Sequence, residues 1–576
     1  MKHILLLPWR FLRMCWFQGI GAALALTKEI VINRRMALQN KYPYESESNA
    51  ASWLPLLQYR PLISIVMPVF NSRWLDEAVA SVLKQSYDNY ELILIDDGSS
   101  NPATLAALKR AASKPHVRLE HTTRNLGVSN ATNAGIALAR GEYIGFMDHD
   151  DILHHDALAL LVRTLNQDTP AAQADIYFTD EVLLDLHGNI AAFTHKSPPT
   201  LENLLSCNTV AHFCVIQRTA LEQLGPLNPA YDGAQDHELM LRAMEKGLRF
   251  KHLPYPLYGW RQDPASLSGN TRGTLPPPES LPTAYRNGKR MLQDYLTRHN
   301  IAATVTDDGY PWYRVKYTLP TTLPEIALII PFHDRVEYLK KLLPSIFKST
   351  YPNYRVYLIN NRSQQPDTRD FLNQINDPRC VIMDFDEPFN YSRLHNVIVE
   401  KLSQEIMIFL NNDIEVITPD WMEAMLEHLL RDGVAAVGCQ LLRRNRRVQH
   451  AGLTFKPSAW ACVRNITDNE KFDFYKMQRE VSGVTAACMM IRRSAFRQIG
   501  GFNEIDFPIG FSDADLCLRL RQAGWKIIYT PFARLYHDES ATRRKQEEAY
   551  EKHTMFTRYA GASALIDPHY SALVED

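Results

Sequence analysis

The sequence predicts an α/β protein in which one domain, a mostly parallel sheet covered by helices, occurs twice. Short, continuously apolar segments alternate with segments of helical periodicity, which is the pattern of such a sheet. The second half of the chain repeats the motifs of the first half in the same order. The length of 576 residues, with 45% hydrophobic and 22% charged residues, also favours a globular chain of more than one domain.

The elements of the first copy follow one another in a regular order. Strands are expected at 62–69, 91–97 and 143–148, and helices at 75–86 and 103–112. The strands are apolar along their whole length, as expected where helices bury both faces of a parallel sheet.

The repeat relates single residues of the two halves. Pro68 corresponds to Pro331 and Asp150 to Asp413, both pairs 263 residues apart. The segment "TLPTTLP" between the copies is typical of a connector. We therefore predict an N-terminal helical extension (1–58), a first domain (59–300), a linker (301–324) and a second domain that ends in a helix (325–576).

The N-terminal extension begins "MKHILLLPWRFLRMCWFQGIGAALALT" and is apolar and aromatic. Pro8, Arg10 and Arg13 interrupt it, and the apolar run that follows has about 14 residues, fewer than the roughly 20 that a membrane span needs. We expect a helix on the membrane surface, with aromatic and leucine side chains in lipid and basic side chains at the headgroups. A cleaved signal peptide, or a helix packed on the protein's own body, remains an alternative.

Charge and cysteine content restrict the partners and the compartment. Lys and Arg number 63 and Asp and Glu 64, a net charge of −1, so no overall positive field attracts nucleic acid. The eight cysteines form no CxxC pair, which indicates neither a zinc knuckle nor a disulfide framework. We expect a cytoplasmic protein at the inner face of the cytoplasmic membrane.

Acidic residues follow the ends of several predicted strands. The stretch "GEYIGFMDHDDILHHD" carries the most. Ligands of such sheets collect at the carboxyl ends of the strands, where Asn71, Asp96, Asp97, Asp148 and Asp150 all fall. Converging carboxylates repel one another unless a cation or a donor-rich ligand lies between them, and Mg²⁺ or Mn²⁺ prefers oxygen ligands. We therefore expect such an ion at Asp148 and Asp150, although one aspartate could simply cap the following helix.

From about Pro61 to Tyr570 the chain resembles the nucleotide-sugar glycosyltransferases of family 2, which have the GT-A fold. The resemblance is to the tandem, rhamnosyltransferase-like type that assembles bacterial O-antigen and other cell-surface polysaccharides. Single motifs are weak, but their order, found twice, is specific. The first copy has "ISIVMPVFNS", "DDGSS", "NLGVSNATNAGI", "YIGFMDHDD", "FTDE" and "AQDHELMLR", and the second has "FNYSRLHN", "FLNNDIEV", "VQHAG", "GFSDADLCLRL" and "LYHDES".

The resemblance implies inverting transfer of a sugar from a dTDP- or UDP-sugar to a hydroxyl of a lipid-linked glycan. It implies that Asp236 and Asp513 are the catalytic bases, because the acceptor hydroxyl must lose its proton as it attacks. Asp236 precedes the expected helix "HELMLRAMEKG", so a role as a helix cap only is the alternative. The metal ligands that it implies are Asp148, Asp150, Asp413 and His537. The expected contacts with the nucleotide sugar are Pro68, Asn71, Asp96, Asp97, Asn125, Asp148, Trp260, Arg261, Asn360, Asn361 and Asn390.

The two copies differ at several of these positions. The first copy has Gly259 where the second has His537, and Trp260 with Arg261 is a candidate substitute for that histidine. The second copy has Asn360-Asn361 in place of the Asp pair at 96 and 97, and "NND" in place of "DHD". We expect both copies to be active. The alternative is that one copy only binds the acceptor or the nucleotide.

Other classes of protein fit the sequence less well. Phosphohydrolases with a His-Asp pair carry it on helices, whereas "DHDD" follows an apolar strand. A dinucleotide oxidoreductase would need GxGxxG after the first strand, and "PVFNSRW" stands there. A carbohydrate-binding protein without catalytic activity remains open, because a fold does not fix a function.

Overall fold

The computed structural model describes residues 50–169, 172–263, 281–456, 463–468, 474–538, 545–559 and 567–569. The membrane-surface helix predicted before residue 50 lies outside these residues. The chain divides into two compact units: the first comprises residues 1–194, 212–226 and 253–266, and the second comprises residues 195–211, 227–252 and 267–576.

The first unit contains a nine-stranded sheet with the order β3-β2-β1-β4-β8-β6-β9-β5, and β7 pairs with β6. Its first four strands are parallel, and β8 runs antiparallel to β4 and β6. The strands are β1 (Ile63–Val69), β2 (Tyr90–Asp96), β3 (Val117–His121), β4 (Tyr143–Phe146), β5 (Ile152–Leu153), β6 (Ile176–Leu184), β7 (Ile190–Thr194), β8 (Cys214–Gln217) and β9 (Phe250–Arg261).

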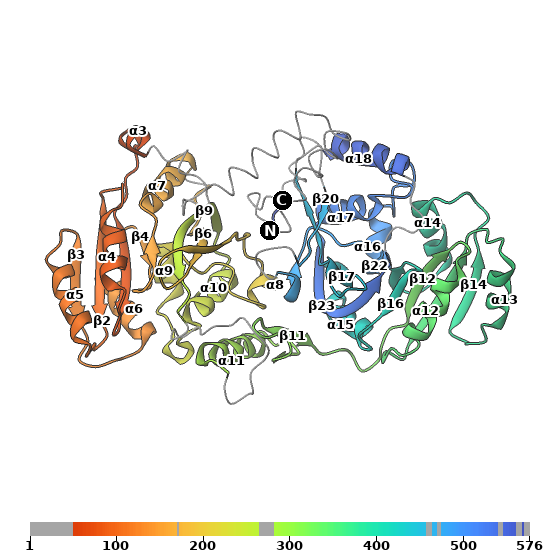
Figure 1. The fold of residues 1–576 in the computed structure, drawn as a ribbon, viewed down its shortest axis with the longest axis horizontal. Helices are drawn as coiled ribbons and strands as arrows, with labels where there is room; N and C mark the ends of the chain where they lie inside the picture. Colours follow the sequence, from red (N-terminus) through yellow and green to blue (C-terminus); the bar gives the residue numbers. More distant parts are fainter. Residues whose placement is uncertain are drawn as a thin grey trace. The chain divides into compact units, whose positions relative to one another are not determined.

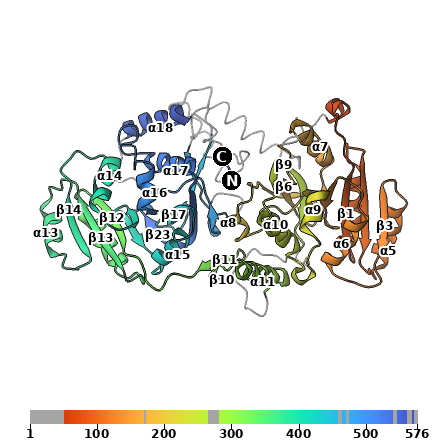
Figure 2. The ribbon, with the colours of Figure 1, turned by 180° about the vertical axis from the view of Figure 1, so that it is seen from behind.

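Helices cover both faces of this sheet (Figures 1 and 2). Ile63, Ile65 and Met67 of β1 share one buried cluster with α4, α5 and α7, and α6 packs on β1 and β2. A Cβ atom on Gly135 of α6 would lie 2.4 Å from Val66, so glycine permits this close approach. The helices are α4 (Leu75–Leu83), α5 (Pro102–Ala112), α6 (Val128–Leu138), α7 (Ala157–Gln167) and α9 (Arg218–Leu224).

The second unit contains a ten-stranded sheet with the order β14-β13-β12-β15-β22-β17-β23-β16, with β18 and β21 paired to β17 and β23. The strands are β12 (Ile326–Phe332), β13 (Tyr354–Asn360), β14 (Cys380–Asp384), β15 (Ile406–Leu410), β16 (Ile414–Val416), β17 (Val434–Leu442), β18 (Val448–His450), β21 (Arg479–Glu480), β22 (Cys488–Arg492) and β23 (Lys526–His537). Alternate residues of β12 face two different buried clusters, so this sheet is also covered on both faces.

The nine strands of the first sheet and the strands of the second sheet other than β21 have the same order along the chain and across the sheet. This confirms the predicted α/β class with two tandem, mostly parallel, Rossmann-like sheets. The helices of the second copy are α12 (Val336–Ile346), α13 (Pro366–Gln374), α14 (Tyr391–Lys401), α15 (Trp421–Leu429), α16 (Arg493–Gln498), α17 (Ser512–Gln522) and α18 (Lys545–Tyr559).

The predicted linker contains structure of its own. β10 (Ala303–Thr306) pairs antiparallel with β11 (Arg314–Tyr317), and this hairpin packs on α11 and α15. The remaining elements are α3 (Ala50–Trp53), η1 (Leu54–Leu56), α8 (Leu201–Leu204), η2 (Pro229–Tyr231), α10 (Gln235–Glu245), α11 (Thr283–Arg298), β19 (Leu453–Phe455), β20 (Val463–Asn465) and η4 (Phe474–Lys476).

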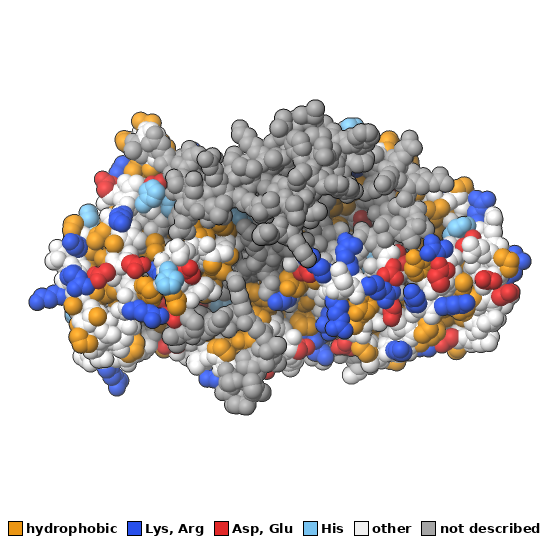
Figure 3. Space-filling model, in the orientation of Figure 1, with side chains coloured by type: hydrophobic (Ala, Val, Ile, Leu, Met, Phe, Trp, Pro, Cys, Tyr) orange, Lys and Arg blue, Asp and Glu red, His pale blue; other side chains and the backbone are white. Residues whose placement is uncertain are grey.

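Basic and acidic side chains are interspersed over the surface shown in Figure 3, in keeping with the net charge of −1. Among the described helices, none combines the length and the apolar character needed to cross a bilayer.

Candidate functional site

The acidic turn after β4 lies at the carboxyl edge of the first sheet. β1 pairs in parallel with β2 on one side and with β4 on the other. Asn71, Asp97 and Asp148 therefore follow the ends of three neighbouring strands at the same edge, which is where ligands of such sheets bind.

Asp148 faces His212, which is not among the residues predicted from the sequence. His212 immediately precedes Phe213 and β8, the strand that pairs antiparallel with β4, so this pairing brings it to the acidic turn. Its Nε2 lies 3.6 Å from Asp148 Oδ2, and its Nδ1 lies 3.4 Å from Oε2 of the buried Glu181. No local motif marks His212; only the strand pairing reveals it.

Asp151 completes this group. Asp148, Asp151 and His212 each offer one ligand atom, and these atoms lie within 4.8 Å of one another. Asp151 is buried and accepts hydrogen bonds of 2.7 Å from the Tyr258 hydroxyl and from the backbone N–H of Arg261. The predicted ligand Asp150 belongs to the same turn, but it is not in this group of three.

The charged side chains of the turn change one another's pKa. Burial raises the pKa of Asp150, and the negative charge of Asp148 raises it further. Partial loss of hydration would also raise the pKa of Asp148, but the imidazole of His212 outweighs this effect and lowers it. Carboxylates that repel one another beside an imidazole are a donor set that fits a divalent cation.

The second copy has a histidine at the corresponding turn. His537 Nε2 lies 3.3 Å from Asp413 Oδ1, and His537 Nδ1 lies 3.1 Å from Oε1 of Gln449. Asp413 Oδ1 is buried and accepts no hydrogen bond within the described part of the chain. A buried carboxylate oxygen without a donor, facing an imidazole, also fits a cation.

The two copies therefore bring a histidine to the turn from different strands. His537 is opposite Ile414 in the β16–β23 pair, and Gly259 is opposite Ile152 in the β5–β9 pair. Gly259 thus occupies the position of His537, and a Cβ atom there would lie 2.7 Å from Leu184 Cδ1. The first copy has His212 at its turn instead, where the strand register gives the second copy Ala487.

In the first copy, the predicted nucleotide contacts Asp96 and Asp97 are buried and hydrogen-bonded within their loops. Asp97 accepts bonds of 2.8 and 2.9 Å from the backbone N–H groups of Leu126 and Gly127. Asp96 accepts a bond of 3.0 Å from the Ser99 N–H, and its other oxygen lies 2.9 Å from His121 Nδ1. These bonds fix the turn "DDGSS", and a contact with the nucleotide stays a prediction.

Asn361, at the position that corresponds to Asp97, donates hydrogen bonds where Asp97 accepts them. Its side-chain N–H₂ donates to the carbonyl oxygens of Phe385 and Glu387, at 2.9 and 2.8 Å. Asn360 likewise donates to Asp384 Oδ1, at 2.9 Å, across the β13–β14 pair. The amide groups of the second copy therefore face hydrogen-bond acceptors, whereas the carboxylates of the first copy face hydrogen-bond donors.

The other predicted nucleotide contacts lie in loops beside these turns. Asn71 accepts bonds of 2.9 Å from the N–H groups of Ser100 and Asn101. Asn125 accepts from the Gly127 N–H at 3.0 Å. Asn390 caps α14 by accepting from the Arg393 N–H at 2.9 Å, and Pro68 lies within β1.

Arg261 is hydrogen-bonded to the acidic turn. It is 1% exposed, and its Nε donates to the backbone oxygen of Asp150 at 2.9 Å. Its guanidinium also pairs with Glu77 at 2.9 Å and lies over the Trp74 ring. Trp260 is half-buried, and its ring centroid is 5.4 Å from that of His212. Contact of either residue with the sugar nucleotide stays a prediction.

The predicted bases occupy equal positions, each the second residue of a helix. In α10, Asp236 Oδ2 accepts from Asn208 Nδ2 at 2.8 Å. In α17, Asp513 accepts from the N–H groups of Ala486 and Ala514 at 3.1 and 2.8 Å. Neither aspartate is the N-cap residue, which is Ala234 in α10 and Phe511 in α17. The N-cap role therefore does not explain why both copies carry an aspartate here.

Comparison with known proteins agrees with the repeat. The family model "Glycosyl transferase family 2" matches residues 64–225 and 327–500, one stretch in each copy. A second family model, "N-terminal domain of galactosyltransferase", matches residues 469–541.

Two long bacterial proteins are similar over most of the chain. The O-antigen biosynthesis protein RfbC of Myxococcus xanthus is 35% identical over 528 residues, which cover 89% of this chain and 40% of RfbC. Protein y4gI of Sinorhizobium fredii is 35% identical over 517 residues, which cover 87% of this chain and 55% of that protein. The chain thus spans about half the length of the curated relatives it matches.

One solved structure aligned with the chain is the mannosyltransferase PcManGT from Pyrobaculum calidifontis in complex with GDP-Man and Mn²⁺. It is 16% identical, covers 42% of this chain and 72% of its own, and aligns with a TM-score of 0.31. The two family 2 matches together cover more than half of the residues. The chain therefore belongs to glycosyl transferase family 2.

Proposed function

We propose that this glycosyltransferase moves sugars, with inversion, from dTDP- or UDP-sugars to a hydroxyl of a growing surface polysaccharide such as O-antigen. Its 35% identity to an O-antigen biosynthesis protein over 89% of the chain supports this substrate class. We propose that both copies are active and that each uses Mg²⁺ or Mn²⁺.

One observation carries the proposal: in both copies an aspartate of the turn after the fourth strand faces an imidazole. Asp148 faces His212 in the first copy, and Asp413 faces His537 in the second. A copy that served only as a scaffold would need the sheet but not this pairing, which each copy builds from a different strand.

The proposed reaction separates two tasks. A divalent ion held by Asp148, Asp150 or Asp151 and His212, or by Asp413 and His537, would neutralise the charge that develops on the departing diphosphate. Tyr258 and Arg261 hold the first turn in shape through Asp151. In the second copy Gln449 orients the imidazole of His537.

Asp236 and Asp513 would accept the proton of the acceptor hydroxyl. Each carboxylate is held by hydrogen bonds, from Asn208 in one copy and from two backbone N–H groups in the other. These hydrogen bonds fix the direction in which each carboxylate meets the incoming hydroxyl.

We further propose a lipid-linked acceptor and peripheral attachment to the inner face of the cytoplasmic membrane. The apolar, arginine-containing sequence before residue 50 supports this part of the proposal. Flotation of the full chain with vesicles of anionic lipid tests it: a chain that stays with the soluble fraction contradicts membrane attachment.

Single substitutions Asp236→Asn and Asp513→Asn test the catalytic proposal. We expect each to slow consumption of one sugar nucleotide by roughly 10²- to 10⁴-fold, the usual loss on removing a general base. Assays with dTDP-rhamnose and UDP-galactose, with and without Mn²⁺, identify the donor of each copy. Asp88→Asn, on a carboxylate that is 78% exposed, is the matched control.

The same assay separates the alternatives. If only one substitution slows turnover, one copy is catalytic and the other binds acceptor or nucleotide. If both variants match the Asp88→Asn control, neither aspartate is a base and the proposed mechanism is wrong.

A further inference from the structure

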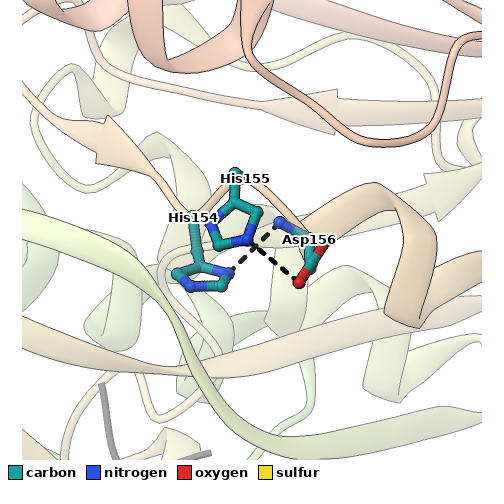
Figure 4. Close-up of side chains that lie close together, drawn as sticks. All are labelled: His154, His155 and Asp156. Carbon is teal, nitrogen blue, oxygen red and sulfur yellow. Dashed lines mark hydrogen bonds and ion pairs between the residues drawn. The ribbon is translucent and has the colours of Figure 1, made fainter. Parts of the chain in front are cut away.

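Three consecutive residues between β5 and α7 form a compact cluster of metal-ligating groups, separate from the acidic turn that precedes β5. Figure 4 shows the side chains of His154, His155 and Asp156 directed toward one another. Each offers one ligand atom, and these atoms lie within 4.8 Å of one another. The ring centroids of the two histidines are 4.2 Å apart.

Asp156 is placed as a helix cap but is not used as one. It is the N-cap residue of α7, yet its side chain makes no capping hydrogen bond. Oδ1 accepts from the Ser86 hydroxyl at 2.7 Å. Oδ2 is buried without a hydrogen bond from the described part of the chain, in a residue that is 1% exposed. A buried carboxylate oxygen in this state needs a cation beside it.

The two histidines present nitrogen atoms to that oxygen. His155 Nε2 lies 3.2 Å from Asp156 Oδ2. His154 Nδ1 accepts a hydrogen bond of 3.2 Å from the backbone N–H of Asp156, which shows that an unprotonated nitrogen points into the cluster.

We propose that His154, His155 and Asp156 form a Zn²⁺ site. Two imidazoles and one carboxylate are ligands that suit zinc, whereas Mg²⁺ favours sets with more oxygen ligands. The 3.2 Å between His155 Nε2 and Asp156 Oδ2 is close to the edge, about 3.3 Å, of a tetrahedron with the usual zinc bond lengths. A bound ion replaces the long N–H contact at His154 Nδ1.

The cluster is open to solvent on the side of His155, which would let an ion enter. The side chain of His155 is 53% exposed, whereas that of Asp156 is 2% exposed. A water molecule would supply the fourth ligand from the exposed side of the His155 ring. The ion would tie the end of β5 to the start of α7 and, through Asp156 and Ser86, to the segment that follows α4.

The alternative is a contact between His155 and Asp156 without a metal ion, and a zinc titration separates the two. The purified full chain is titrated with Zn²⁺ by calorimetry, and the variants His212→Ala and His537→Ala identify any zinc that binds at the two acidic turns. We expect one zinc ion to remain in both of these variants, and His155→Ala to weaken its binding by at least ~10-fold. His187→Ala, at an exposed histidine, is the matched control.

Two further measurements test whether these residues are the zinc ligands. Asp156→Asn keeps the shape and removes the charge, and it should lose zinc as well. Co²⁺ in place of Zn²⁺ should give the visible absorption of a tetrahedral site in the wild type and in His187→Ala only. A wild type that binds no zinc, or a zinc isotherm unchanged by His155→Ala, overturns the proposal.

Discussion

The asparagines that replace aspartates in the second copy have neighbours whose hydrogen-bonding groups suit an amide. Asp97 lies among backbone N–H groups, and Asn361 lies among backbone carbonyl oxygens. A carboxylate only accepts hydrogen bonds, whereas an amide also donates them. The change from aspartate to asparagine therefore follows the polarity of the loop beside each strand, and does not by itself indicate a lost nucleotide contact.

We predict that each residue destabilises the loop of the other copy. Asp97→Asn would turn an N–H₂ group toward the N–H groups of Leu126 or Gly127. Asn361→Asp would place a carboxylate against two carbonyl oxygens. Each change should lower the free energy of unfolding by about 1–3 kcal/mol, the cost of a buried polar group without its partner. Urea unfolding measures this, with Asp76→Asn on an exposed carboxylate as control.

A result in which either variant unfolds like the Asp76→Asn control would contradict this reading of the loops. The asparagines of the second copy would then be differences in function between the two copies.

At the scale of elements, each copy has a helix that holds the loop leading to its proposed base. In the first copy, Asn287 of α11 donates to the backbone oxygen of Asp232 at 2.8 Å, just before α10. In the second copy, Glu551 of α18 accepts bonds of 2.8 Å from the N–H groups of Ile509 and Gly510, just before α17. Both helices follow the last strand of their copy, so the repeat extends to them.

Glu551 should therefore stabilise the loop that carries Asp513. It is 2% exposed, and Glu551→Ala removes the acceptor of the buried N–H of Gly510 and of the partly buried N–H of Ile509. We expect a loss of at least ~2 kcal/mol in the free energy of unfolding and slower transfer by the second copy alone. Glu551→Gln keeps one acceptor oxygen and should lose about half as much.

Chemical denaturation and the two donor assays measure these effects. The neighbouring Tyr550→Ala is the control, because that side chain is 63% exposed. Equal stability and equal turnover of Glu551→Ala and Tyr550→Ala would show that α18 does not hold this loop.

At the scale of the whole molecule, the sequence predicts what depends on local pattern and misses what depends on pairing. Apolar periodicity and the repeat predict both sheets and the acidic turn. His212 is missed because it is 64 residues beyond Asp148 and reaches the turn only through the pairing of β8 with β4. The hairpin β10–β11 is missed for a similar reason: its buried residues pack on helices of both copies.

The two copies should differ in how strongly they hold a divalent cation. The first turn has three carboxylates, Asp148, Asp150 and Asp151, whereas in the second Asp413 follows two neutral asparagines. Because affinity for hard cations rises with the number of charged oxygen ligands, we expect two classes of Mn²⁺ site that differ by at least ~10-fold in Kd. Electron paramagnetic resonance of free Mn²⁺ during a titration measures both. His212→Ala should remove the tight class and His537→Ala the weak one, and a single class of equal sites would contradict the assignment.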